Sequence, residues 1–171
     1  MRPTWDEVWM DFADTIAKRS KCSRAIVGCV IVDKDQNVLS ASYNGPPSSY
    51  EAEGPCSSWC PRAQGIGGTS SSYDNCPSVH AEQNGIARVD RSRSVGATAY
   101  VTRSCCVTCA KLLAAAGIVR VVHRVDSIDF HRNPTEVEEF LKQCNVQVER
   151  WVPSATTKQY TAESSQLDGG C

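Results

Sequence analysis

The chain has 171 residues, ten of them cysteine, and a formal net charge of −1. This length suits one domain with its own core, and the near-neutral charge excludes the strong positive field that draws many proteins to nucleic acid. The sequence contains no run of 18 apolar residues, so we expect no membrane-spanning helix. The first residues lack the apolar core of a signal peptide, so we expect a cytoplasmic protein with reduced thiols.

The N-terminal part predicts a helix, a hairpin and a long loop. Apolar residues recur at helical spacing through residues 4–20, and Thr4 with Glu7 matches a capping box. Two apolar runs, 25–32 and 38–43, flank a polar turn and predict antiparallel strands. Residues 46–78 are rich in Ser, Gly and Pro, so something other than an apolar core must hold them if they are ordered.

Helices and strands alternate in the rest of the chain. We expect helices at 79–88, 106–116 and 134–143, and strands at 97–102, 118–123 and 146–151. Such alternation is typical of an α/β domain with partly parallel strands. The prediction is therefore one α/β domain over residues 1–152, with a five-stranded mixed sheet flanked by helices, followed by a polar, mobile tail at 153–171.

The strongest chemical signal is His80-x-Glu82 followed by Cys106-x-x-Cys109, each at the expected start of a helix. One imidazole and two thiolates are three ligands of a tetrahedral Zn²⁺ and leave open the fourth position that a catalytic zinc needs for water. Glu82 would stand beside that water and move protons to the ring and the leaving amine. A plain structural zinc site is the alternative, but this combination is the signature of zinc nucleobase deaminases.

The same segments resemble the cytidine and deoxycytidylate deaminase superfamily. Residues 80–86, HAEQNGI, resemble its HAExNAI segment, residues 100–111, YVTRSCCVTCAK, resemble YVTxxPCxxCAK, and AGI follows at 116–118. Trp5-Asp6, RSKC at 19–22, VGCVIV at 27–32 and YNGPP at 43–47 are similar to deoxycytidylate deaminases in particular. The resemblance spans roughly residues 4–125. It implies the three-layer cytidine-deaminase-like fold and hydrolysis of dCMP to dUMP and ammonia, which supplies dUMP for thymidylate synthesis.

The resemblance also implies substrate contacts. Asn44 would contact the sugar, the backbone N–H of Ala81 would bind the cytosine carbonyl, and the backbone at Ser104 would receive the exocyclic amine. From the residues alone, Asn44 is equally well a turn residue before a glycine. Cations for a phosphate are Lys21 and Arg24, which we favour, with Arg62 and Arg103 as further candidates. The alternative for each cation is a solvated surface charge.

The remaining cysteines suggest a second metal site. Some relatives carry a structural zinc whose ligands come from before the first strand and from the long insertion, and the four cysteines in matching places are Cys22, Cys56, Cys60 and Cys76. Four thiolates would close a tetrahedron and fasten the 46–78 insertion. Free thiols in a loop are the alternative. Cys29 and Cys144 fit buried apolar positions.

Cys105 stands where the family usually has proline before the first zinc cysteine. Proline fixes the shape of a loop, so we expect this chain to differ in its tolerance of a substituent at cytosine C5, such as a methyl or hydroxymethyl group. The substrate range could therefore include 5-substituted dCMP.

The resemblance further implies a homo-oligomer, hexameric in relatives, with dCTP and dTTP as effectors and Mg²⁺ accompanying the bound effector. Membranes and polymeric nucleic acid are not expected partners. The alternatives are a deaminase of dCTP, of free cytidine or of tRNA adenosine, and a non-catalytic zinc-stabilised binding module. Glu82 argues against a purely structural site, which needs no proton shuttle, and the near-neutral charge argues against tRNA.

Overall fold

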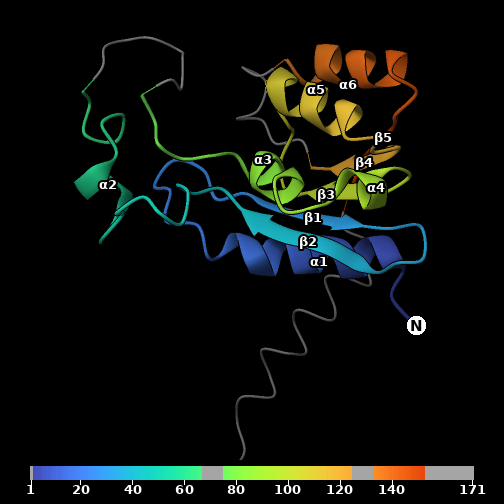
Figure 1. The fold of residues 1–171 in the computed structure, drawn as a ribbon, viewed down its shortest axis with the longest axis horizontal. Helices are drawn as coiled ribbons and strands as arrows, with labels where there is room; N and C mark the ends of the chain where they lie inside the picture. The colour runs from blue at the N-terminus through green and yellow to red at the C-terminus, as the bar shows by residue number, and fades with distance from the viewer. Residues whose placement is uncertain (1, 67–74, 125–132, 153–171) are drawn as a thin grey trace, which may run out of the picture.

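The computed structural model describes residues 2–66, 75–124 and 133–152, and the predicted tail at 153–171 lies outside them (Figure 1). Five strands form one mixed sheet in the order β2-β1-β3-β4-β5. Their bounds are Gly28–Val32 (β1), Val38–Tyr43 (β2), Thr98–Val101 (β3), Arg120–His123 (β4) and Gln147–Arg150 (β5). Strand β1 is antiparallel to β2 and β3, whereas β3–β4 and β4–β5 are parallel. The predicted five-stranded mixed sheet is confirmed.

Helices cover both faces of the sheet, which gives the three layers that the resemblance implied (Figure 1). Helix α1 (Trp5–Ala17) lies on one face, and α3 (Ala81–Ile86), α5 (Val107–Ala115) and α6 (Pro134–Gln143) lie on the other. Strand β1 is buried throughout and its side chains alternate. Val30 and Val32 pack with α1, while Cys29 and Ile31 pack in the core on the opposite face.

The capping box at the start of α1 is confirmed. The backbone N–H of Thr4 donates to Glu7 Oε2 at 2.8 Å, and the N–H of Glu7 donates to Thr4 Oγ1 at 3.3 Å. The helix ends at Ala17, three residues earlier than predicted. Helix α6 and strand β2 have the predicted bounds.

The start of helix α3 and the presence of helix α4 (Arg91–Ser94) also differ from the prediction. Helix α3 begins at Ala81, because Val79 pairs instead with Gly45 as an isolated β-bridge and His80 is extended at the N-cap. Helix α4 was not predicted, because four residues are too few to show a helical period. Its start is fixed by Asp90, whose side chain accepts from the N–H of Ser92 at 2.8 Å.

The described part of the insertion contains a short helix, α2 (Cys56–Trp59), which lies apart from the sheet in Figure 1. Within the part of the chain that the structure covers, no helix has the length and apolar character needed to cross a membrane.

Candidate active site

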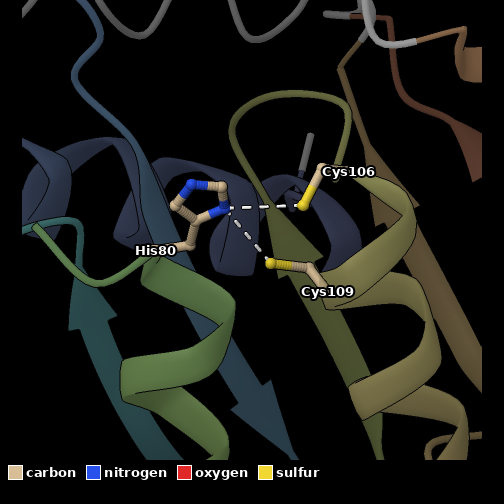
Figure 2. Close-up of side chains that lie close together, drawn as sticks. All are labelled: His80, Cys106 and Cys109. Atoms are coloured by element: carbon tan, nitrogen blue, oxygen red, sulfur yellow. Dashed lines mark hydrogen bonds between the residues drawn. The ribbon is translucent and has the colours of Figure 1, made fainter. Parts of the chain in front are cut away.

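Three side chains that the sequence assigned to zinc meet above the sheet (Figure 2). His80 is the N-cap of α3, Cys106 is the N-cap of α5, and Cys109 lies in the first turn of α5. His80 Nδ1 lies 3.6 Å from Cys106 Sγ and 3.3 Å from Cys109 Sγ. A nitrogen and a sulfur ligand on one tetrahedral zinc, with bonds of about 2.0 Å and 2.3 Å, lie about 3.5 Å apart. The spacing therefore fits a single zinc ion.

One of the two sulfur ligands, Cys106, is held in the form that binds a metal. The hydrogen bond from Cys109 and the nearby imidazole of His80 outweigh burial and lower the pKa of Cys106 to about 3. The thiolate is the form of cysteine that binds metals. The same hydrogen bond, burial and the charge of Glu82 raise the pKa of Cys109, so a metal ion is needed to ionise both thiols together.

Glu82 lies beside this centre without belonging to the ligand set. It is the second residue of α3 and its exposed fraction is 3%. Its charge contributes to the raised pKa of Cys109 and, after burial, to that of Cys29, which places the carboxylate near the sulfur atoms. Among the residues the structure describes, the one group of three potential ligands whose atoms all lie within 4.8 Å of one another is His80, Cys106 and Cys109. Glu82 therefore borders the metal centre without belonging to the group of three ligands.

The end of β2 positions the start of α3, through residues that the sequence analysis missed. Ser42 Oγ lies 2.8 Å from the carbonyl oxygen of Ala81, and the Asn84 side-chain amide donates to the carbonyl of Tyr43 at 3.0 Å. The Gly45–Val79 bridge aligns the residues just before His80. Asn84 lies within the quoted motif, so its identity was visible, whereas the role of Ser42 depends on a contact 39 residues away along the chain.

The centre opens into a cavity of about 310 Å³. His80, Ala81 and Glu82 line one part of it, and residues from the segment before β1 and from the insertion line the rest. This volume is at the lower end of the range of roughly 300–1,000 Å³ for small-molecule sites. A ligand bound there would contact the metal centre and the insertion together.

Sequence comparison agrees with this geometry. The profile of the cytidine and deoxycytidylate deaminase zinc-binding region matches residues 3–125. This chain belongs to the cytidine and deoxycytidylate deaminase family. The deoxycytidylate deaminase of Mycobacterium phage D29 is 44% identical over 131 residues, which cover 74% of this chain and 98% of that protein. The human deoxycytidylate deaminase is 28% identical over 152 residues, covering 89% and 82% of the two chains.

Solved structures show the same family likeness. The dCMP deaminase from the cyanophage S-TIM5, in complex with dCMP and dUMP, matches with a TM-score of 0.66 and 27% identity. The match covers 88% of this chain and 99% of that one. The cytidine-deaminase-like fold is therefore confirmed for this deaminase.

Of the three residues predicted to contact the substrate, two line the cavity and the third does not. Asn44 and Ala81 line the cavity of the deaminase. The Asn44 amide also holds the segment before β1, because its Oδ1 accepts from the N–H of Val27 and its Nδ2 donates to the carbonyl of Ala25, both at 2.8 Å. Ser104 is buried in the loop before the cysteines. Their contacts with substrate stay predictions.

The predicted phosphate ligands divide into two groups. Arg24, Arg62 and Arg103 all line the cavity. Lys21 is exposed, and its ammonium donates instead to the carbonyl oxygen of Ala52 at 2.9 Å. The structure thus favours the arginines over Lys21 as cations for a ligand in the cavity.

The four remaining predicted zinc ligands border the same cavity. The sulfur atoms of Cys60 and Cys76 lie 3.7 Å apart. Two thiolates on one tetrahedral zinc are about 3.8 Å apart. The charges of Cys22 and Cys60 contribute to the raised pKa values of Cys56 and Cys76, although burial is the largest cause of both shifts. The four thiols border one cavity, but their sulfur atoms, unlike the ligand atoms of the His80 centre, do not all lie within 4.8 Å of one another.

The other cysteines gave one correction. Cys29 is fully buried, as predicted, but Cys144 is exposed because it is the C-cap residue of α6, where the chain turns toward β5. Cys105 is buried and packs in the same core cluster as Cys109.

Proposed function

We propose that this deaminase hydrolyses dCMP to dUMP and ammonia, and so supplies dUMP for thymidylate synthesis. The observation that supports this proposal most directly is the geometry of the metal centre. His80 Nδ1 and two sulfur atoms have the spacing of zinc ligands, and the buried Glu82 lies beside them. The names of the relatives in phage, yeast and animals, and the dCMP and dUMP in the cyanophage structure, support this choice of substrate.

The chemistry divides between the metal and the protein. A bound Zn²⁺ would act as a Lewis acid and lower the pKa of water to about 7. Glu82 takes a proton from water as the water oxygen bonds to C4 of cytosine, and Glu82 delivers that proton to N3 of the ring. Glu82 then transfers the remaining proton of the hydroxyl group on C4 to the amino group, the C4–N bond breaks, and ammonia leaves as the C4 carbonyl forms. Water and dCMP thus become dUMP and ammonia.

The residues around Glu82 orient the base for these proton transfers. We assign the cytosine carbonyl to the backbone N–H of Ala81, the departing amine to the backbone at Ser104, and the sugar to Asn44. Ala81 is fully buried at the first position of α3, so a hydrogen bond from its N–H would be shielded from water.

We also propose that Cys22, Cys56, Cys60 and Cys76 hold a second, structural zinc. The 3.7 Å separation of the Cys60 and Cys76 sulfur atoms supports it. Backbone N–H groups of Ala63 and Arg62 bond to the sulfur of Cys60, and the pKa of Cys60 is lowered despite burial. Backbone hydrogen bonds from Ser23 and Ser78 act in the same direction on Cys56 and Cys76, but burial is larger there and the pKa values of both stay raised. This ion would hold the insertion in place of an apolar core.

Further properties follow from the family resemblance and stay predictions. They are a homo-oligomer, hexameric as in relatives, regulation by dCTP and dTTP with Mg²⁺ at the effector, a cytoplasmic location, and turnover of 5-substituted dCMP because of Cys105.

A substrate panel tests the proposed activity. Purified full-length protein loaded with zinc would be given dCMP, 5-methyl-dCMP, dCTP, deoxycytidine, cytidine and a tRNA, and ammonia release would be measured. We expect the highest kcat/KM for dCMP. A higher value for a nucleoside, dCTP or tRNA would contradict this function in favour of one of the other deaminases. The ratio of kcat/KM for 5-methyl-dCMP to kcat/KM for dCMP measures the tolerance of a substituent at cytosine C5 that we expect from Cys105.

A further inference from the structure

We propose that Ser42 and Gly85 are a pair of positioning residues that sets how closely helix α3 packs against the sheet, and thereby where His80 and Glu82 lie. The inference rests on the proposed function, because it names what holds the metal ligand and the proton carrier of that reaction in place. Neither Ser42 nor Gly85 is among the described residues that line the cavity, so both act through α3 without touching the substrate.

Helix α3 carries two of the functional side chains within three consecutive residues. His80 is its N-cap, and Glu82 is its second residue. The helix has only six residues, Ala81–Ile86, and it packs on β1 and β2. The two zinc cysteines belong to the start of a different helix, α5. A shift of α3 against the strands therefore moves the imidazole and the carboxylate together relative to both sulfur atoms.

Ser42 hydrogen-bonds to the residue that stands between these two side chains. It is fully buried on β2, and its Oγ lies 2.8 Å from the carbonyl oxygen of Ala81 and 3.1 Å from that of Cys29. Both carbonyls are acceptors, so they share the one proton of the hydroxyl group. Cys29 lies directly opposite Ser42 on β1. The hydroxyl group thus ties both strands to the peptide between the metal ligand and the acid.

Gly85 leaves room for this hydroxyl group. It is buried in α3, and a Cβ added to it would lie 2.9 Å from Ser42 Oγ, 3.3 Å from Ile31 Cδ1 and 3.7 Å from Cys29 Sγ. A methyl group there would push α3 away from β2 or turn the hydroxyl group out of both hydrogen bonds. The HAExNAI segment that residues 80–86 resemble has alanine at this position, so the glycine is a departure of this chain.

The backbone conformation of Gly85 gives no separate reason for glycine. Its backbone is helical, and its φ is not in the positive range that L side chains avoid. Alanine is the more favourable residue inside a helix. The contact with Ser42 is therefore what opposes alanine here, since the other tight neighbour, Ile31 Cδ1, is the free end of a longer side chain.

A double-mutant cycle tests the pair. Ser42→Ala, Gly85→Ala and the double variant would be compared with wild type and with the control Ser40→Ala. Ser40 is a buried serine two residues earlier on the same face of β2, and its hydroxyl group has no hydrogen-bond partner among the described residues.

Three properties are measured for each of the five proteins. They are kcat and KM for dCMP with the zinc-loaded protein, the melting curve, and the visible absorption spectrum of the protein loaded with Co²⁺. The spectrum depends on the geometry of the metal ligands and needs no turnover. The four cysteines of the second site are unchanged in these variants, so a spectral difference reports the His80 centre.

We expect Gly85→Ala to lower kcat about 10- to 100-fold, with a smaller change in KM, because the ligand and the acid are displaced from their places. Ser42→Ala loses one hydrogen bond, and kcat should fall about 3- to 10-fold. The double variant should be more active than Gly85→Ala and close to Ser42→Ala, because the new methyl group takes the space of the hydroxyl group. The cobalt spectrum should change in Gly85→Ala and return toward wild type in the double variant, and Ser40→Ala should match wild type throughout.

Two results would overturn the pairing. One is a double variant whose loss of kcat equals the product of the two single losses, and the other is a Gly85→Ala protein with the kcat and cobalt spectrum of wild type. If Gly85→Ala does not fold, the double variant decides, since the proposal requires it to fold with activity close to that of Ser42→Ala. A wild-type protein without dCMP turnover would contradict the proposed function instead, and the cobalt spectra would still decide whether the pair positions His80.

Discussion

Glu82 lies beside the metal centre and is not one of its three grouped ligands. It is buried at 3% exposure, and its charge acts on Cys109 and Cys29 in the surrounding core. Keeping a carboxylate in such a place is unfavourable unless it is paired with other groups or acts on a ligand. Its place beside the three grouped ligands, in a chain of the deaminase family, favours an enzyme over a zinc-stabilised binding module.

Replacing Glu82 by Gln should remove activity and keep the metal. Glutamine has nearly the same shape but cannot carry the proton, so we expect kcat for dCMP to fall about 10²- to 10⁴-fold. Metal analysis of the variant and of wild type should both give two zinc ions per chain. One zinc in both proteins would contradict the structural site at the four cysteines, and an active Glu82→Gln protein would contradict the proton-transfer role.

Cys105 shows how one departure from a family pattern can act indirectly. Its side chain is buried in the core with Cys29 and Cys109, and it is not among the described residues that line the cavity. Any effect on a substituent at cytosine C5 must therefore arise from the backbone of the loop before Cys106, which proline would otherwise constrain.

At the scale of elements, the approach of α1 to the sheet depends on Gly28. A Cβ placed on Gly28 would lie 2.0 Å from the carbonyl oxygen of Ala13 and 3.1 Å from Ala17 Cβ. Helix α1 therefore contacts β1 where β1 has no side chain, and the backbone oxygen on the helix cannot move away alone.

Gly28→Ala should thus displace α1 and destabilise the protein by about 1–3 kcal/mol or more. Chemical denaturation of the variant and wild type measures the difference. Gly45→Ala is the matched control, because a Cβ there would meet its nearest neighbour, Tyr43 Cε2, at an ordinary 3.5 Å. Equal stability of Gly28→Ala and wild type would show that α1 does not depend on this contact.

Elements with a clear period were predictable from sequence, and elements fixed by tertiary contacts were not. The apolar spacing and Thr4 predicted α1, and Pro134 at the first position of α6 predicted α6. The start of α3 was misplaced, because pairing of Val79 with Gly45 decides it and no local signal reports that pairing.

The same distinction applies to the site. Motif spacing predicted His80, Cys106 and Cys109, and the structure brings them together. It could not predict that Ser42 contacts Ala81, nor that Lys21 bonds to Ala52 while Arg62 reaches the cavity. The first contact depends on how α3 packs against β2, and the other two depend on how the insertion folds against the segment before β1.

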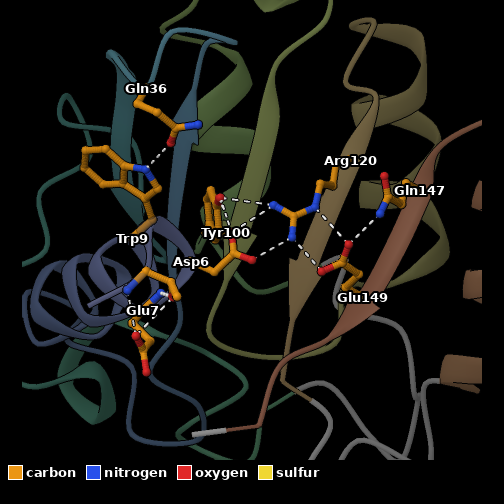
Figure 3. Close-up of polar contacts among 9 residues, drawn as sticks. Asp6, Glu7, Trp9, Gln36, Tyr100, Arg120, Gln147 and Glu149 are labelled. Carbon is orange, nitrogen blue, oxygen red and sulfur yellow. Dashed lines mark hydrogen bonds and ion pairs between the residues drawn. The ribbon is translucent and has the colours of Figure 1, made fainter. Parts of the chain in front are cut away.

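At the scale of the whole molecule, a polar network joins α1 to the parallel half of the sheet (Figure 3). Arg120 on β4 donates to both carboxylate oxygens of Asp6, at 2.9 and 2.7 Å, and to Glu149 on β5 at 3.1 and 2.5 Å. Tyr100 on β3 donates to Asp6 Oδ1 at 2.6 Å. Trp9 Nε1 donates to Gln36 at 2.7 Å, which ties the same helix to the hairpin turn. Helix α1 is thus bonded directly to β3, to β4 and to the turn between β1 and β2, and is linked to β5 through Arg120.

The network makes acid stability depend on Asp6. The hydrogen bond from Arg120 is the largest cause that holds the pKa of Asp6 below its ordinary 3.8, with Tyr100 also lowering it and burial opposing. A carboxyl group whose pKa is depressed on folding stabilises the protein fully above its unfolded pKa, and loses that contribution as pH falls through the folded pKa. The stabilisation by Asp6 should therefore be constant near neutral pH and disappear below about pH 4.

Asp6→Asn should lower the free energy of unfolding at pH 7 by about 1 kcal/mol, a modest value because a third of the side chain reaches solvent. The difference between variant and wild type should shrink as pH falls below about 4, because the wild-type carboxyl group then loses its charge as well. Urea denaturation at pH 7, 5, 4 and 3 measures both effects. Asp35→Asn, in the exposed hairpin turn, is the control and should stay within about 0.5 kcal/mol of wild type. A difference for Asp6→Asn that persists undiminished at pH 3 would show that the network stabilises the fold through shape and neutral hydrogen bonds rather than through the charge of Asp6.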